Sequence, residues 1–209
     1  ICLDGDADRL ILADEQGQIR DGDQILATLA LDAAEQGTLH GPVIGTVMSN
    51  LGLETVLAKH NIGFERAAVG DRYIYERMVK TGSNLGGEPS GHVLLPQLTR
   101  TGDGLIAALQ ILSVICRTGK PASELLSCFT PIPQRLVNLR DIDKAVLSDK
   151  RVTAQVAAVE AELGGQGRVL LRPSGTEPLI RVMVEAVDKA RLDAAMDKLV
   201  TVLKVASQE

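Results

Sequence analysis

The chain has 209 residues, a formal net charge of −5 and an aromatic share of only 2%. Since neither basic clusters nor stacking aromatic residues occur, nucleic-acid binding is not favoured. The longest apolar helical run, 105–116, is shorter than the roughly 18 residues that a membrane-spanning helix needs. The 45% hydrophobic share predicts a globular core of aliphatic side chains. Cys2, Cys116 and Cys128 are odd in number and irregularly spaced in apolar surroundings, which predicts reduced core cysteines in a cytoplasmic protein.

The first part of the chain alternates strand-like and helix-like segments. We expect strands at 10–13, 42–48 and 64–69, and helices at about 24–36, through Leu53, Val56 and Leu57, and at 71–80. Asp23 is suited to cap the first of these helices. A further helix at 102–118 is apolar nearly all round, which predicts a central position. Strands separated by helices at this spacing favour an α/β fold, a mostly parallel sheet with helices on both faces.

The last part of the chain predicts a smaller α+β domain. Two prolines within three positions interrupt helix at 129–133, so we place a linker there. Short strands, a helix before Gly164, an alternating strand at 179–186 and a last helix through Leu203 follow. The expected divisions are 1–16 as the end of a preceding metal-loop domain, 17–128 as the α/β domain, 129–133 as the linker and 134–209 as the α+β domain. Because the chain opens on what looks like the end of a buried strand without a Met, we expect a C-terminal piece of a longer protein.

Three carboxylates at alternate positions open the chain. Asp4, Asp6 and Asp8 are hard oxygen donors of the kind that Mg²⁺ prefers, and their crowding is unfavourable without a cation. An EF-hand is the obvious competitor, since Glu15 occupies the twelfth place of such a loop. Arg9, however, stands where that loop needs Gly, and a strand follows directly. The remaining alternative is a solvated acidic turn.

A second candidate segment follows the predicted strand at 64–69. Asp71 and Arg72 stand directly after it, and ligands of open α/β sheets bind beyond the carboxyl ends of strands. A helix-capping Asp beside a surface Arg would explain the same residues equally well.

A third segment, 86–92, places a carboxylate, a hydroxyl and an imidazole on a glycine-rich turn. Glu88 and Ser90 suit sugar hydroxyls, and His92 has the chemistry to move a proton near neutral pH. A lone histidine is more often structural, which is how we interpret His40 and His60. Because Glu88 and Ser90 lie within four residues of it, we expect a functional role for His92.

The fourth segment has the character of a phosphate site. Gly175 permits the backbone to turn amides toward an anion, and Ser174 and Thr176 add hydroxyl donors. Arg172 and Arg181 supply bidentate charge-assisted hydrogen bonds, each worth roughly 1.5 to 3 kcal/mol. A plain hairpin turn would need neither arginine.

Taken together and in this order, the four segments resemble the α-D-phosphohexomutase superfamily, and the resemblance runs the whole length of the chain. Such proteins have four domains around a cleft, and this chain is similar to the end of the second and all of the third and fourth. The resemblance implies Mg²⁺ ligands (Asp4, Asp6, Asp8), a catalytic Arg9 beside the reacting phosphoryl group, residues facing the sugar (Asp71, Arg72, Glu88, Ser90 and His92, the last as an acid or base), and residues holding the other phosphate (Arg172, Ser174, Gly175, Thr176, Arg181).

Within the superfamily, the segments 46–50, 69–73, 84–88 and 101–104 are most similar to bacterial enzymes that act on hexosamine phosphates. The implied reaction passes a phosphoryl group from a phosphoserine to glucosamine 6-phosphate, and the bisphosphate intermediate then leaves glucosamine 1-phosphate. The serine is not in this sequence, so we expect the isolated chain to be inactive and to need the missing N-terminal domains as partners.

Three alternative functions stay open. Pro89 stands where Gln is expected in a hexosamine-phosphate enzyme, so mutases of mannose or glucose phosphates are the near alternative. A noncatalytic phosphosugar-binding module is another. A phosphatase with Asp4 as nucleophile is a third, although it gives Asp8 and Arg9 no covalent role.

Overall fold

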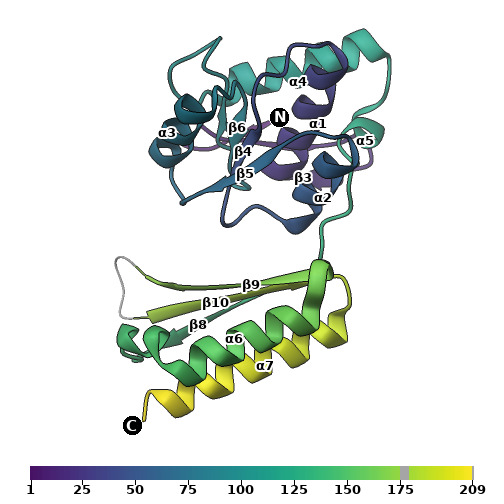
Figure 1. Ribbon diagram of the computed structural model, residues 1–209. Helices are drawn as coiled ribbons and strands as arrows, with labels where there is room; N and C mark the ends of the chain where they lie inside the picture. Colours follow the sequence, from purple (N-terminus) through teal and green to yellow (C-terminus); the bar gives the residue numbers. More distant parts are fainter. Residues whose placement is uncertain (175–178, 209) are drawn as a thin grey trace. The chain divides into compact units, whose positions relative to one another are not determined.

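The computed structural model describes residues 1–174 and 179–208 and divides into two compact units, Ile1–Pro131 and Ile132–Glu209 (Figure 1). Each unit has its own cluster of buried aliphatic side chains. The predicted fold class, an α/β unit followed by a smaller α+β unit, is confirmed. The assignment of residues 1–16 to a preceding domain stays a prediction.

The first unit is built on a four-stranded sheet in the order β5-β4-β6-β7. The central strand β4 (Val43–Thr46) runs parallel to β5 (Phe64–Ala67) and β6 (Gly86–Gly87), and β6 pairs antiparallel with β7 (Val93–Leu94). The predicted strands therefore lie where the sequence placed them, and the parallel pairing confirms the mostly parallel sheet.

Helices cover both faces of this sheet, as predicted. Val43 belongs to the core that α1 (Gly22–Glu35), α2 (Leu51–Lys59) and α4 (Gly104–Thr118) complete, while its neighbour Ile44 packs with α3 (Asp71–Thr81). Successive side chains of a strand point to opposite faces, so one strand supplies both cores. The short α5 (Ala122–Leu125) follows α4.

The beginning of α1 differs from the prediction. Asp21, not Asp23, caps the helix: its side chain accepts a hydrogen bond from Gln24 N, and the Gln24 side chain accepts one from Asp21 N. Asp23 lies inside the first turn, is buried, and accepts a 2.6 Å hydrogen bond from the backbone N–H of Asn50. The helix therefore starts two residues earlier than expected, and a carboxyl group enters the interior.

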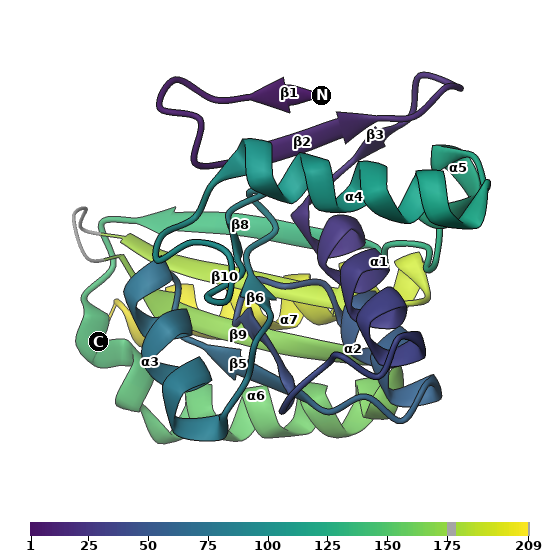
Figure 2. The same ribbon diagram turned by 90° about the horizontal axis from the view of Figure 1, so that it is seen from above.

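A three-stranded antiparallel ribbon of β1 (Cys2–Leu3), β2 (Leu10–Ala13) and β3 (Ile19–Arg20) runs beside α4 (Figure 2).

The expectation that α4 is central is wrong: one face is buried, but Leu105 and Leu109 are 54% and 53% exposed. The expectation of core cysteines is also wrong, because two of the three free cysteines are exposed and the third is half-buried. No helix within 1–174 or 179–208 is long and apolar enough to cross a bilayer.

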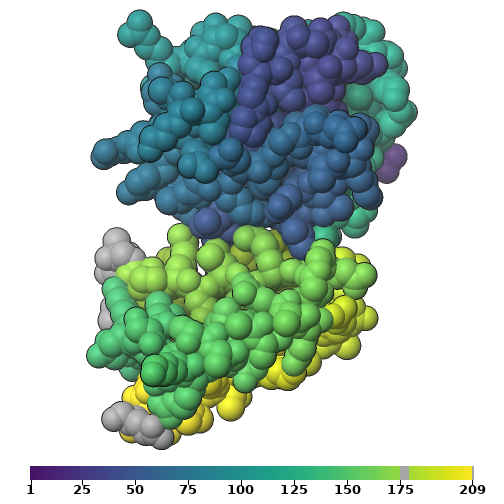
Figure 3. Space-filling model, viewed as in Figure 1, coloured from purple at the N-terminus to yellow at the C-terminus, as the bar shows by residue number. Residues whose placement is uncertain are grey.

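The second unit is an antiparallel sheet with two helices on one face. Its strands are β8 (Gln134–Arg140), β10 (Leu179–Ala186) and β9 (Gly167–Pro173), in that order across the sheet. The helices α6 (Lys150–Leu163) and α7 (Lys189–Ala206) lie side by side on it (Figure 1). In the space-filling view the two helices are packed against each other (Figure 3). Two short 3₁₀ helices, η1 (Lys144–Ser148) and η2 (Gly164–Gln166), flank α6.

The alternation predicted for β10 is confirmed. Ile180, Val182 and Val184 point into the core under the helices. Glu185, on the opposite side of the strand, is fully buried and forms an ion pair with Arg168 of β9. The ion pair offsets the cost of removing the Glu185 carboxylate from water.

Candidate functional site

The three aspartates of the first loop converge. Asp4, Asp6 and Asp8 each offer a carboxylate oxygen, and these oxygens all lie within 4.8 Å of one another. The backbone makes this possible by a turn in which Ala7 adopts a positive φ of 62°. Arg9 lies beside the cluster: its backbone N–H donates to Asp4 Oδ1 at 3.2 Å, and its Nε is 3.6 Å from Asp4 Oδ2. Arg9 is half-exposed, so its charge is available to a ligand as well.

The cluster suits a hard divalent cation. One oxygen of Asp8, Oδ1, is buried and accepts no hydrogen bond from any residue of the described ranges. A buried carboxylate oxygen without a donor is costly, and a cation is the partner that three converging carboxylates accept best. Asp4, Asp6 and Asp8 therefore have the chemistry to hold Mg²⁺.

The acidic loop is held against the turn at 88–92 of the same unit. Leu10 N–H donates to Gly91 O at 3.0 Å, and Arg9 and His92 form an isolated β-bridge. His92 Nδ1 lies 2.9 Å from Asp8 Oδ2. Gly91 is required by this approach, because its φ is +92° and a Cβ there would lie 2.1 Å from Leu10 O.

The same turn reaches the segment that precedes α3. Glu88 Oε1 accepts a 2.7 Å hydrogen bond from Gly70 N, and Glu88 Oε2 accepts one from Ser90 Oγ at 3.2 Å. The turn thus joins two of the predicted segments, with His92 directed to the acidic loop and Glu88 directed to residue 70. Glu88 and Ser90 are both half-buried.

Asp71 and Arg72 both lie at the exposed beginning of α3. Asp71 Oδ1 accepts a hydrogen bond from Arg72 N at 2.6 Å, and Gly70 rather than Asp71 is the N-cap residue. Arg72 Nε donates to Glu76 at 2.9 Å, and this hydrogen bond raises the pKa of the guanidinium. The two side chains therefore stand at the carboxyl end of β5, where the sequence placed them, but Arg72 is directed along its own helix.

The second unit brings two arginines together at one end of its sheet. Arg172 of β9 and Arg181 of β10 are cross-strand partners. Burial is the main cause that lowers the pKa of Arg172, and the charge of Arg181 adds to it. The Nε of Arg181 is buried without a hydrogen-bond partner among the described residues. Like charges directly opposite in a sheet are unfavourable, so this pair favours an anionic ligand.

The loop between these strands includes residues that lie outside the described ranges, Gly175 and Thr176 among them. Ser174, just before them, is buried, and its carbonyl oxygen accepts a 2.6 Å hydrogen bond from Lys144 Nζ. Lys144 is therefore a third cation beside this loop. The sequence did not point to it, because it lies 30 residues away and in no motif.

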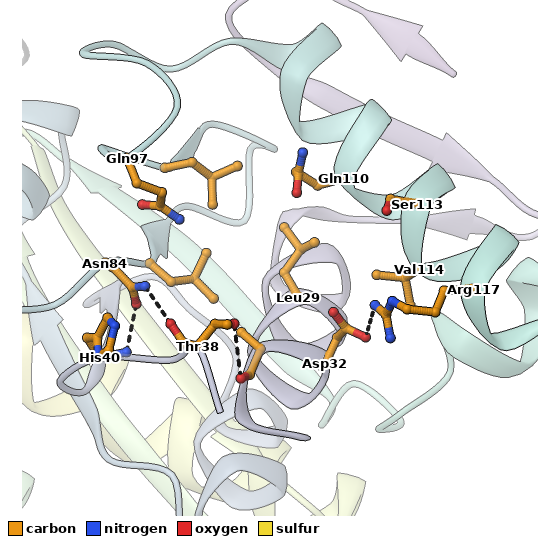
Figure 4. A pocket seen from close by; sticks show the side chains of 13 residues that line it. Leu29, Asp32, Thr38, His40, Asn84, Gln97, Gln110, Ser113, Val114 and Arg117 are labelled. Carbon is orange, nitrogen blue, oxygen red and sulfur yellow. Dashed lines mark hydrogen bonds and ion pairs between the residues drawn. The ribbon is translucent and has the colours of Figure 1, made fainter. Parts of the chain in front are cut away.

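A separate cavity of about 410 Å³ lies between α1, α4 and neighbouring loops of the first unit. Figure 4 shows an ion pair of Asp32 with Arg117 and the Asn84 side chain bonded to the backbone of Thr38 and His40. None of the predicted site residues lines it.

A comparison with known protein families shows to which family the chain belongs. Residues 21–132, more than half of its length, match the phosphoglucomutase/phosphomannomutase α/β/α domain III, and residues 135–202 match the C-terminal domain of the same family. The chain therefore belongs to the phosphoglucomutase/phosphomannomutase family.

The curated relatives that are about 50% identical to this chain are phosphoglucosamine mutases. The chain is 51% identical to a phosphoglucosamine mutase of Novosphingobium aromaticivorans over 208 residues, and 51% identical to one of Paracoccus denitrificans over 209 residues. Each alignment covers 99% of this chain and 47% of the relative. The chain thus spans about half the length of the curated relatives it matches.

Solved structures share the fold. The chain superposes on the N-acetylphosphoglucosamine mutase of Aspergillus fumigatus, solved with GlcNAc-6P and magnesium, with a TM-score of 0.78 at 22% identity, covering 98% of this chain and 48% of that one. A phosphoglucomutase/phosphomannomutase family protein of Burkholderia thailandensis gives a TM-score of 0.80 at 22% identity, with 98% and 46% covered.

Proposed function

We propose that this chain forms the magnesium-, sugar- and phosphate-binding part of a phosphoglucosamine mutase. In the complete protein, a phosphoserine outside this chain gives its phosphoryl group to glucosamine 6-phosphate, and the bisphosphate intermediate returns the other phosphate to leave glucosamine 1-phosphate. The observation that carries this proposal is the docking of the three-aspartate loop against the turn of Glu88, Ser90 and His92. The 51% identity to phosphoglucosamine mutases supports the choice of sugar.

The acidic loop would act on the reacting phosphoryl group. Asp4, Asp6 and Asp8 would hold Mg²⁺, which when bound neutralises charge on a transferring phosphoryl group. Arg9, half-exposed beside the cluster, would place a guanidinium against the same oxygens. Its contacts with Asp4 and Asp8 hold the side chain at the loop without removing it from solvent.

The remaining residues would bind the substrate. Glu88 and Ser90 present a carboxylate and a hydroxyl, which suit the hydroxyl and amino groups of the sugar, with Asp71 and Arg72 at the neighbouring helix start. Arg172 and Arg181, with Ser174, Gly175 and Thr176, would hold the phosphate that does not react. The pairing of the two arginines across β9 and β10 supports that role.

The test is substrate discrimination by the complete protein. We expect kcat/KM to be higher for glucosamine 6-phosphate than for mannose 6-phosphate or glucose 6-phosphate. Pro89 keeps a mutase of these other hexoses as the second candidate, because it removes a backbone donor beside Glu88. A preference for either of them would overturn the assignment of the sugar.

A second experiment concerns the 209-residue chain by itself. We expect the purified chain to bind Mg²⁺ but to show no mutase turnover, since the phosphoryl donor lies elsewhere. Turnover by the chain alone would refute the proposed phosphoserine mechanism. Calorimetry with Mg²⁺ and glucosamine 6-phosphate measures what the chain binds by itself. Turnover of glucosamine 6-phosphate by the complete protein separates the mutase from a noncatalytic binding module, because only the mutase converts the bound sugar phosphate. The cytoplasmic location expected from the sequence stays a prediction.

A further inference from the structure

The cavity beside α1 and α4 lies at the other end of the sheet from the acidic loop and its turn. Thr38 lines it just before β4, and Leu85 lines it directly before β6, so the cavity is at the amino ends of these parallel strands. The turn at 88–92 and residues 70–72 follow β6 and β5 and lie at the carboxyl ends. A ligand in the cavity would therefore not compete with one bound at the acidic loop.

The cavity has the size and the lining of a small-molecule site. Its volume of about 410 Å³ lies within the roughly 300 to 1,000 Å³ that is usual for such sites. Four aliphatic side chains, each at most 7% exposed, form the apolar part of its wall (Leu29, Leu85, Leu95, Val114). An apolar wall suits the face of a ring, because removing both surfaces from water is favourable.

The charges of the lining are unsuited to a sugar phosphate. Among the described residues, Asp32 is the one carboxylate and Arg117 the one guanidinium that line the cavity, and they form an ion pair with each other. Both lie in the last turns of their helices, α1 and α4, where the helix dipoles oppose an anion. The cavity therefore suits an uncharged ligand.

Two unused carboxamides determine which polar groups such a ligand needs. Gln97 and Gln110 lie on different sides of the cavity (Figure 4), and neither side chain forms a hydrogen bond with any residue in 1–174 or 179–208. Asn84 differs, because it donates to Thr38 O and accepts from His40 N–H. A carboxamide carries an acceptor and a donor side by side. It pairs with an adjacent donor and acceptor on the edge of a planar heterocycle, as glutamine does with N6 and N7 of adenine.

We infer that this cavity is a second ligand site of the first unit, and that its ligand is an uncharged nucleoside with the donor–acceptor edge of adenine. The base lies against the aliphatic wall, and the carboxamide of Gln97 or Gln110 bonds to its edge. The exposed hydroxyl of Ser113 is available to the ribose. The inference does not depend on the proposed function, because no residue of the acidic loop lines the cavity.

The probe is adenosine, titrated into the 209-residue chain and followed by assigned ¹H–¹⁵N correlation spectra. N6,N6-dimethyladenosine is the matched ligand, since it keeps the ring system and lacks the N6 donor. Gln97→Leu and Gln110→Leu each remove one carboxamide, and Gln155→Leu, on α6 of the second unit, is the matched control. Thermal unfolding followed by circular dichroism establishes that each variant is folded.

We expect adenosine to bind with a Kd of about 0.1 to 1 mM, which a ligand of this size reaches at ordinary efficiency. The largest shifts should fall on Leu85, Leu95 and Ser113. Because a neutral hydrogen bond is lost, N6,N6-dimethyladenosine should bind roughly three- to tenfold more weakly, and so should at least one of the two cavity variants toward adenosine. Gln155→Leu should bind adenosine as the wild type does.

Four results would overturn the inference. The first is the absence of shifts at these residues at about ten times the expected Kd, and the second is equal affinity for the two nucleosides. Shifts confined to residues 88–92 would place adenosine at the acidic loop and its turn instead. Tighter binding of methyl β-D-glucoside than of adenosine would assign the cavity to a polyol.

The complete protein gives an independent readout. Adenosine should leave the KM for glucosamine 6-phosphate unchanged, and competitive inhibition would contradict a separate site. If the complete protein did not turn over glucosamine 6-phosphate at all, the proposed function would fail, while adenosine binding by the 209-residue chain would still decide the inference about the cavity.

Discussion

Asp23 gives the sharpest prediction about stability. Burial raises the pKa of this carboxyl from 3.8 to about 7, with Asp21 adding to the rise, although the Asn50 N–H, Ser49 and the charge of Arg66 oppose it. One of its oxygens, Oδ1, has no hydrogen-bond partner among the described residues, while Oδ2 accepts from Asn50 N. The substitution Asp23→Asn keeps an acceptor for Asn50 and removes the titration.

The sign and size follow from proton binding. Between the unfolded pKa of 3.8 and the folded pKa of about 7, the folded chain holds a proton that the unfolded chain releases, so stability falls as pH rises through this window. At about 1.4 kcal/mol per pKa unit, the full shift corresponds to roughly 4 kcal/mol, of which about 2 kcal/mol falls between pH 5 and pH 7. Above pH 8 almost no further loss from this group is expected, because the folded chain has then released the proton as well.

The assay is urea unfolding followed by circular dichroism, because the chain has no tryptophan. The free energy of unfolding of the first unit is compared between wild type and Asp23→Asn at pH 5 and pH 8. We expect the wild type to lose about 3 kcal/mol relative to the variant between these pH values. Asp197→Asn, at an exposed carboxyl of the second unit, is the control and should leave the difference unchanged. A wild-type–variant difference that does not change with pH would refute the buried, protonated carboxyl.

Three further predictions concern packing and charge. Gly102→Ala should lower the free energy of unfolding by about 1 to 3 kcal/mol because its Cβ would meet a buried ring, whereas Gly165→Ala, with nothing within 4 Å, should change it little; thermal unfolding of both variants decides this. Glu185→Gln should cost about 1 to 3 kcal/mol in urea unfolding, since it removes the charge of a buried carboxylate that pairs with the half-buried Arg168, and an unchanged free energy of unfolding would contradict a tight pair. Inorganic phosphate should raise the unfolding temperature of the wild-type chain but not of Arg172→Gln, and an equal rise in both would count against the arginine pair as an anion site.

Local patterns predicted most of the fold. The alternation in 179–186 matches β10, and the helix expected at 71–80 is α3, because side-chain periodicity reports directly which face of a segment is buried. The N-cap residue of α1, for which two aspartates compete, was predicted wrongly. Asp21 and Asp23 are both good caps, and only the reciprocal hydrogen bonds with Gln24 distinguish them.

Exposure of whole faces could not be predicted in the same way. The pattern of α4 is apolar nearly all round, yet Leu105 and Leu109 remain half-exposed. Periodicity gives the apolar positions of a helix but not which neighbours the chain brings against them. The same limit applies to the cysteines, whose apolar neighbours in the sequence are not their neighbours in space.

The residue types and spacing of the four loops are local properties, and they were sufficient by themselves to indicate the superfamily and the chemistry of a phosphosugar site. The tertiary structure alone decided which of these groups meet. Asp8 and His92 are 84 residues apart, and Lys144 reaches Ser174 across 30. Contacts of this kind depend on the path of the chain through the sheet and on backbone approaches such as that at Gly91, which no spacing in the sequence encodes. Chemistry is therefore carried by the side chains, while the role of each is set by the partners that folding places beside it.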